Sequence, residues 1–269
     1  MPKTVLVPLD GTTDAEHALP FALRLAGRLD APMVLVTAQL DGDADVRWLE
    51  AAVESVHRAD VRAEVVRSAS VADALRAVGG SCDDPFVCMA THARTAVGQA
   101  RLRSVAETVV RTVELPAVLV GPDVAPDRDV TGPLLVCLDG SAASEAIVPV
   151  AREWAHALAV NAVVVHVFHP LDVETATMPD RVVGAAVEQL RAEVDVETVL
   201  VRGRSVDSTI ARIVEERQPA LVAMATHGRT GLGRVVFGSV ATSVVRHSPC
   251  PVLVVRPSPE LLAGPAPRT

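Results

Sequence analysis

Residues 89–111 read MATHARTAVGQARLRSVAETVVR, and residues 224–246 read MATHGRTGLGRVVFGSVATSVVR. When the two stretches are aligned, 13 of the 23 residues are identical. A second repeated pair precedes them, VLVPLDGTTDAEHA at 5–18 and LLVCLDGSAASEAI at 134–147. The repeat period is far longer than that of solenoid arrays, so each copy is predicted to be a complete domain.

The duplication also sets the expected domain boundaries. We expect a first domain over residues 1–125, a linker over 126–132, a second domain over 133–257 and a flexible tail over 258–269. Each half has the usual size of a domain with its own core. The segment leading into the second half, GPDVAPDRDVTG at 121–132, contains two prolines that stiffen it.

Valine-rich runs of strand length alternate with amphipathic stretches of helix length throughout the chain. Expected strands in the first half lie at 4–9, 33–38, 61–67, 86–90 and 117–120. Those of the second half lie at 134–138, 163–168, 194–201, 221–225 and 252–255 and are apolar on both faces, as buried parallel strands are. Expected helices of the second half lie at 141–158, 178–192, 205–217 and 238–247. Ser141 and Ser205 are placed to cap two of them.

This strict alternation of strand and helix predicts the fold class. We expect two tandem Rossmann-like α/β domains, each with a doubly wound, mainly parallel sheet of five strands flanked by helices. Such sheets bind ligands at the carboxyl ends of their strands, where the strand order reverses.

Composition narrows the function classes. Acidic residues outnumber basic ones, 33 to 25, and the net charge is −8, so neither a nucleic acid nor an anionic membrane is an expected partner. Apolar runs are too short to cross a membrane, and we expect a cytoplasmic protein. Lys3 is the only lysine, which excludes a Walker A loop. The histidines and the four cysteines lack metal-ligand spacing, so no metal site made by protein alone and no disulfide framework is expected.

Two features converge at the expected ligand edge of the second sheet. Asp139 closes the first strand, with Asp10 as its copy in the first half. An acidic residue there can contact a ligand, or it can simply form the turn into the following helix. The second feature is a glycine-rich loop from Ala225 to Gly238 and Ser239 at the mouth of a helix. Backbone N–H groups and a hydroxyl there make a phosphate cradle without lysine, although many glycine-rich loops only turn the chain.

The spacing within that loop resembles the universal stress protein family, whose nucleotide-binding members carry Gly-x2-Gly-x9-Gly-Ser/Thr after the fourth strand. Gly228, nine residues and Gly238-Ser239 match this motif, while Ala225 stands at its first glycine. The resemblance covers about residues 3–121 and 133–257. It implies binding of ATP or AMP, with or without Mg²⁺, in which Asp139 contacts the adenosine and Val167 lines the adenine pocket. The implied site comprises Leu138, Asp139, Val167, Ala225, Gly228, Gly238, Ser239 and Val240.

Two arginines flank the loop, Arg229 and Arg234, and either contact the phosphates or are solvated at the surface. The first half has lost the glycines, because Ala93 and Arg103 replace them. We therefore expect a degenerate first site, composed of Asp10, Ala38, Ala90, Ala93, Arg103 and Ser104. As an alternative, Arg103 itself pairs with phosphates.

Three function classes follow from these observations. The first is a regulatory module of a stress response that changes state when it binds adenine nucleotide. The second is an interaction scaffold of the same fold that binds no nucleotide, and the third is an enzyme, at most a slow ATPase, since no catalytic residue stands out. Because many members of the family dimerise through the last strand, we also expect the two halves to form an intramolecular pair, with a homodimer as a further option. The protein partner is not identified by the sequence.

Overall fold

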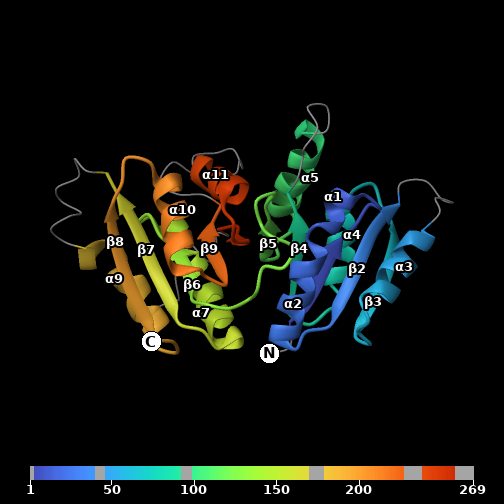
Figure 1. The fold of residues 1–269 in the computed structure, drawn as a ribbon, viewed down its shortest axis with the longest axis horizontal. Coiled ribbons are helices and arrows are strands. Elements are labelled where there is room, and N and C mark those ends of the chain that lie inside the picture. The colour runs from blue at the N-terminus through green and yellow to red at the C-terminus, as the bar shows by residue number, and fades with distance from the viewer. Residues whose placement is uncertain (1–2, 40–45, 92–98, 170–178, 227–237, 258–269) are drawn as a thin grey trace, which may run out of the picture. The chain divides into compact units, whose positions relative to one another are not determined.

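The structure is a computed structural model that describes residues 3–39, 46–91, 99–169, 179–226 and 238–257, with the backbone alone for 99–104 and 179–181. The chain divides into two compact units, Met1–Val130 and Thr131–Thr269. In each unit the strands lie side by side in one sheet, with helices on both of its faces (Figure 1).

The first unit contains five parallel strands in the order β3-β2-β1-β4-β5. Its elements are β1 (Thr4–Pro8), α1 (Thr13–Glu16), α2 (Leu19–Leu29), β2 (Met33–Gln39), α3 (Arg47–Ser55), β3 (Val61–Arg67), α4 (Val71–Gly79), β4 (Pro85–Ala90), α5 (Gln99–Thr112) and β5 (Ala117–Val120). The strand order reverses between β1 and β4, because β2 and β3 lie on one side of β1 and β4 and β5 on the other.

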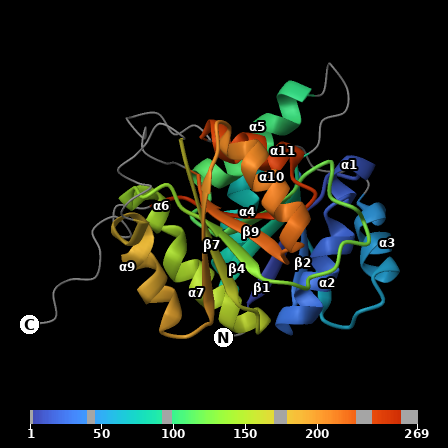
Figure 2. The ribbon, with the colours of Figure 1, turned by 60° about the vertical axis from the view of Figure 1, so that its left-hand side comes forward.

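The second unit repeats this arrangement with the order β8-β7-β6-β9-β10. Its elements are β6 (Leu134–Cys137), α6 (Ala142–Glu145), α7 (Ile147–Leu158), β7 (Ala162–Phe168), α9 (Pro179–Arg191), β8 (Val196–Arg202), α10 (Val206–Arg217), β9 (Leu221–Ala225), α11 (Ser239–His247) and β10 (Val252–Val255). Helix α7 packs beside α9, and α10 packs beside α11 (Figure 2). The predicted doubly wound fold is therefore confirmed.

The central strands are buried because helices cover both of their faces. Every residue of β6, β9 and β10 is buried, as expected for parallel strands of this kind. Strand β8 differs from the prediction, because it begins at Val196 rather than at 194 and exposes Glu197 and Thr198. It is an outer strand of the unit and pairs only with β7 in the described part of the sheet, so polar residues there remain in water.

The expected helix caps are present, but one expected helix is divided in two. The Ser141 hydroxyl accepts a hydrogen bond from the backbone N–H of Ser144, and Ser205 does the same for Ser208. The stretch 141–158 forms α6 and then α7, with the break at Ala146. Pro149 has no N–H to donate to the carbonyl four residues earlier, so it lies in the first turn of a new helix.

No helix among the described residues is long and apolar enough to cross a membrane.

Candidate functional site

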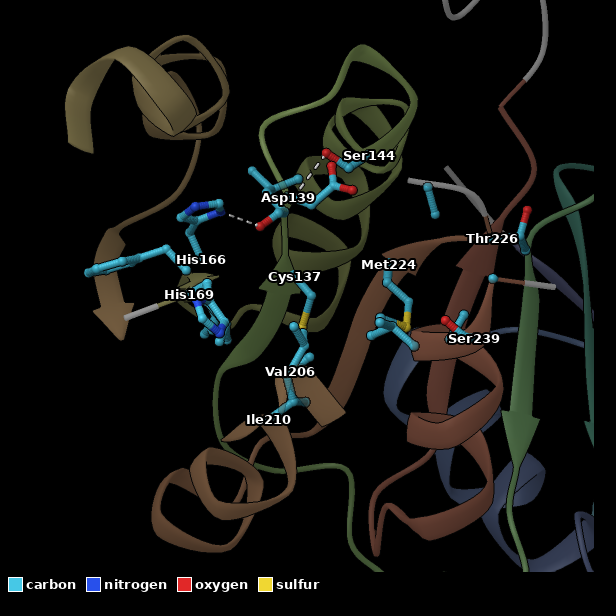
Figure 3. A pocket seen from close by; sticks show the side chains of 18 residues that line it. Cys137, Asp139, Ser144, His166, His169, Val206, Ile210, Met224, Thr226 and Ser239 are labelled. Carbon is cyan, nitrogen blue, oxygen red and sulfur yellow. Dashed lines mark hydrogen bonds between the residues drawn. The ribbon is translucent and has the colours of Figure 1, made fainter. Parts of the chain in front are cut away.

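A pocket of about 420 Å³ opens in the second unit at the carboxyl ends of β6, β7 and β9 (Figure 3). Strands β6 and β9 are the neighbours between which the strand order reverses. A crevice forms there because the connections from these two strands leave toward opposite faces of the sheet. Val206 and Ile210 of α10 contribute to its lining, and so do Gly238 and the first turn of α11.

Most of the site implied by the resemblance lines this one pocket. The lining residues from that set are Leu138, Asp139, Val167, Ala225, Gly238, Ser239 and Val240. They come from segments that are far apart in the sequence and meet because the sheet aligns the ends of its strands. Gly228, Arg229 and Arg234 lie outside the described residues.

Asp139 forms a turn at the wall of the pocket. Its Oδ1 accepts hydrogen bonds from the backbone N–H of Ser141 at 2.9 Å and from the Ser141 hydroxyl at 2.6 Å. Gly140 follows with φ of +79°, and a Cβ added there would lie 2.5 Å from Cγ1 of Val182. The turn-forming alternative is thus present, and the turn also fixes the carboxylate in the lining of the pocket.

The start of α11 offers hydrogen-bond donors to the pocket. An α-helix leaves its first N–H groups without an intrahelical acceptor, and Gly238 as N-cap supplies no side chain to bind them. The Ser239 side chain is exposed beside them. Together with the positive end of the helix dipole, these groups suit an anion such as phosphate.

The requirement for glycine at 238 is steric rather than conformational. Gly238 has φ of −56°, which any residue adopts. Its N–H donates to the Thr226 carbonyl at 2.8 Å, and an added Cβ would lie only 3.1 Å from that oxygen. A side chain at 238 would therefore crowd the Thr226 carbonyl, which would have to shift to make room for it.

Sequence reasoning missed several lining residues, among them the buried His166. Its Nδ1 lies 2.9 Å from the Leu138 carbonyl, and its ring stacks with that of Phe168 at a centroid distance of 6.3 Å. The Arg202 guanidinium lies over the Phe168 ring, 5.8 Å from its centroid. The signal available in the sequence was the histidine itself, because it interrupts a run of valines. The corresponding residue in the first copy is Thr37.

The described lining supplies hydrogen-bonding groups and one buried thiol. Cys137 lines the pocket, but burial raises the pKa of its thiol to about 12, so the thiol stays protonated at neutral pH. Among the described residues, no group of three or more acidic, histidine or cysteine side chains could hold a metal ion. Asp139, the α11 N–H groups and Ser239 supply hydrogen bonds to a polar ligand.

The matching pocket of the first unit is smaller, about 80 Å³. Asp10 and Ala90 line it, whereas Ala38 is not among its lining residues. Ala93 lies outside the described residues, and Arg103 and Ser104 belong to α5, where the backbone alone is described. Asp10 forms the same turn as Asp139, since its Oδ1 accepts from the Thr12 N–H at 3.0 Å and from the Thr12 hydroxyl at 2.6 Å.

The fold and the pocket define a class: tandem doubly wound α/β domains with a ligand-sized cavity where the strand order of the second sheet reverses. A family model described as the universal stress protein family matches residues 1–121 and 131–256. The chain therefore belongs to the universal stress protein family and carries its domain twice.

Known proteins of similar sequence agree with this membership, and a solved structure shares the fold. A universal stress protein of Mycobacterium tuberculosis is 28% identical over 226 residues, which cover 79% of this chain and 75% of the relative. One of Mycolicibacterium smegmatis is 26% identical, over 94% of this chain and 97% of the relative. The crystal structure of a universal stress protein from Archaeoglobus fulgidus matches with a TM-score of 0.68 and 18% identity, over 94% of this chain and 98% of that one.

Proposed function

We propose that the second unit binds an adenine nucleotide, ATP or AMP, and that this chain is a nucleotide-responsive regulatory protein of a stress response. The observation that carries the proposal is the convergence of Asp139, Val167, Gly238 and Ser239 on one pocket at the reversal of strand order. Their positions in the sequence span about a hundred residues, and the aligned ends of the strands bring them to one cavity of about 420 Å³.

The chemistry of the pocket suits the parts of a nucleotide. The N-terminus of α11, with Ser239, is suited to the phosphates, and Mg²⁺ would arrive with them if the ligand is ATP. Asp139 is an acceptor for hydroxyl or amino groups of the adenosine. Val167 supplies part of an apolar wall for the base, alongside Val206 and Ile210.

The first unit is the weaker site in this proposal. Its pocket has about 80 Å³ against about 420 Å³ in the second unit. Arg103 stands at the position of Gly238, and the contact between Gly238 and the Thr226 carbonyl supports exclusion of a side chain there. The expected cytoplasmic location and the pairing of the two halves remain proposals from the sequence.

Titration calorimetry with ATP tests the function. We expect one strong site per chain in the wild type, and we expect Gly238→Arg, which copies the first half, to abolish most of the binding. Loss of a few phosphate contacts, at roughly 1.5–3 kcal/mol each, weakens affinity by a factor of about ten or more per contact. Ala185→Arg, on the exposed side of α9, is the matched control and should bind as the wild type does.

Two results would contradict the proposal. Equal binding by Gly238→Arg and wild type would remove α11 from the site. Absence of binding to ATP and AMP, together with no adenine nucleotide in protein purified from cells, would favour the nucleotide-independent scaffold. A slow ATPase would instead be recognised by steady turnover above that of Gly238→Arg.

A further inference from the structure

One peptide bond at the edge of the pocket is held by side chains at both of its polar atoms. The Leu138–Asp139 peptide connects the end of β6 to the Asp139 turn. Its carbonyl, on Leu138, lies 2.9 Å from Nδ1 of His166, and its N–H, on Asp139, donates to the Ser144 hydroxyl at 3.3 Å. Figure 3 draws both contacts beside the pocket.

The hydrogen-bonding roles in this arrangement are determined by chemistry. A carbonyl only accepts, so Nδ1 of His166 must carry the proton in this contact. The Ser144 hydroxyl donates to the Ser141 carbonyl at 2.8 Å, which leaves its lone pairs to accept from Asp139. His166 is 4% exposed and Ser144 is 5% exposed, so water competes little with either bond.

Rotation of the Leu138–Asp139 peptide would break both of these hydrogen bonds. The preceding peptide, which carries the Leu138 N–H, is fixed as well. The Leu138 N–H donates to the Val165 carbonyl on the neighbouring strand at 3.0 Å. Rotation of the Leu138–Asp139 plane would change the direction in which the Asp139 side chain leaves the backbone. The two side chains thus control the orientation of a carboxylate that lines the pocket.

The first unit provides a natural comparison in which this arrangement is absent. Its strands pair in the same register, and the Leu9 N–H donates to Val36 at 2.9 Å, just as Leu138 donates to Val165. Thr37 stands at the position of His166 and Ala15 at that of Ser144. Ala15 has no side-chain hydroxyl to accept the Asp10 N–H, and within the described residues of this unit no side chain is seen to donate to the Leu9 carbonyl.

We propose that His166 and Ser144 are positioning residues for Asp139, and that they give the second unit part of its advantage in nucleotide affinity. Both side chains also line the pocket, and the role assigned to them here is exerted through the Leu138–Asp139 peptide. This inference rests on the proposed nucleotide binding of the same pocket, and it extends the asymmetry of the two sites beyond the glycines of the loop.

Substitutions that copy the first unit test the proposal. His166→Thr and Ser144→Ala should each weaken ATP binding by roughly three- to ten-fold in calorimetry, the effect of one lost hydrogen bond. His166→Asn places an amide N–H close to the position of Nδ1 and should retain most of the affinity. Arg212→Ala, in an exposed ion pair on α10, is the control and should leave the affinity unchanged.

A double-mutant cycle with Asp139→Ala distinguishes positioning from general packing. If His166 and Ser144 act through Asp139, their substitutions should have little further effect once the Asp139 carboxylate is absent. If Asp139→Ala binds too weakly to measure, Asp139→Asn takes its place in the cycle. Thermal unfolding checks that each variant is folded, and if His166→Thr is not, Ser144→Ala and His166→Asn carry the test.

The outcomes separate this inference from the proposed function. Wild-type affinity in both His166→Thr and Ser144→Ala, or undiminished losses in the Asp139 background, would overturn the positioning role while leaving nucleotide binding intact. Failure of the wild type to bind ATP and AMP would overturn the proposed function, and the inference with it.

Discussion

The two Asp-Gly turns differ in what surrounds the glycine, although Gly11 and Gly140 both have φ of +79°. A side chain at either position is strained by roughly 1–2 kcal/mol, because the left-handed region brings Cβ close to the backbone. At Gly140 the added Cβ would also lie 2.5 Å from the short, branched side chain of Val182. At Gly11 the nearest atom belongs to the Trp48 indole, at 3.2 Å.

We therefore expect Gly140→Ala to lower the free energy of unfolding more than Gly11→Ala does. The additional overpacking at Gly140 adds about 1–3 kcal/mol to the strain that both variants share. Urea denaturation followed by circular dichroism measures the difference between the paired variants. A larger loss in Gly11→Ala would indicate that Val182 moves aside easily.

At the scale of elements, a side-chain hydrogen bond connects the two helices that flank the pocket. The Ser243 hydroxyl on α11 donates to Oδ2 of Asp207 in the first turn of α10 at 2.5 Å. The Ser205 hydroxyl donates to the other carboxylate oxygen. In the repeat alignment Ala72 stands at the position of Asp207, so the first unit has no carboxylate at this position.

These bonds predict a pH dependence of stability. The hydrogen bond from Ser205, followed by those from Ser243 and the Ser208 backbone, lowers the pKa of Asp207 to about 2. An unfolded aspartate titrates near pH 3.9, so the stabilisation is fully present above that value and is lost as the pH falls toward 2. The difference in unfolding free energy between wild type and Asp207→Asn should therefore shrink from pH 5 to pH 2.

Chemical denaturation at a series of pH values measures this difference. Ser243→Ala removes one of the two hydroxyl donors. The difference in unfolding free energy between wild type and Ser243→Ala should therefore change less with pH than the difference between wild type and Asp207→Asn. A difference between wild type and Asp207→Asn that stays constant over the whole range would contradict the assignment to Asp207.

At the scale of the whole molecule, the duplication makes each unit a control for the other. In a Gly238→Arg background, the double change Ala93→Gly and Arg103→Gly should restore measurable ATP binding, now in the first unit. The Trp48 indole lies beside that unit's Asp10–Gly11 turn, since a Cβ added to Gly11 would be 3.2 Å from it, so the fluorescence of Trp48 should respond when the restored site is occupied. Trp154, the other tryptophan, is fully buried in α7 of the second unit.

A competing hypothesis predicts a different result. If Arg103 pairs with the phosphates itself, the wild-type chain should bind two nucleotides, and Arg103→Gly should weaken the first site rather than restore it. Calorimetric stoichiometry for the wild type and for Gly238→Arg separates the two hypotheses.

Much of the fold could be read from local patterns. The repeated segments, the valine-rich strands and the caps at Ser141 and Ser205 are encoded by neighbouring residues, and each agrees with the structure. The exposed residues of β8 could not be predicted in this way, because an outer strand is defined by which neighbours it lacks. The break between α6 and α7 had a local signal in Pro149. The helical spacing of apolar residues continues across the break, so the sequence predicted a single helix there.

The sequence by itself determined the duplication, the alternation of strand and helix and the residues whose spacing resembles a nucleotide motif, because these are properties of short segments. Only the tertiary structure decided that Leu138, His166 and Ser144 meet at one peptide beside Asp139. That meeting depends on the register of β6 against β7 and on the position of α6, which no local pattern specifies. The steric reason for glycine at 238 likewise appears only when α11 is placed against Thr226.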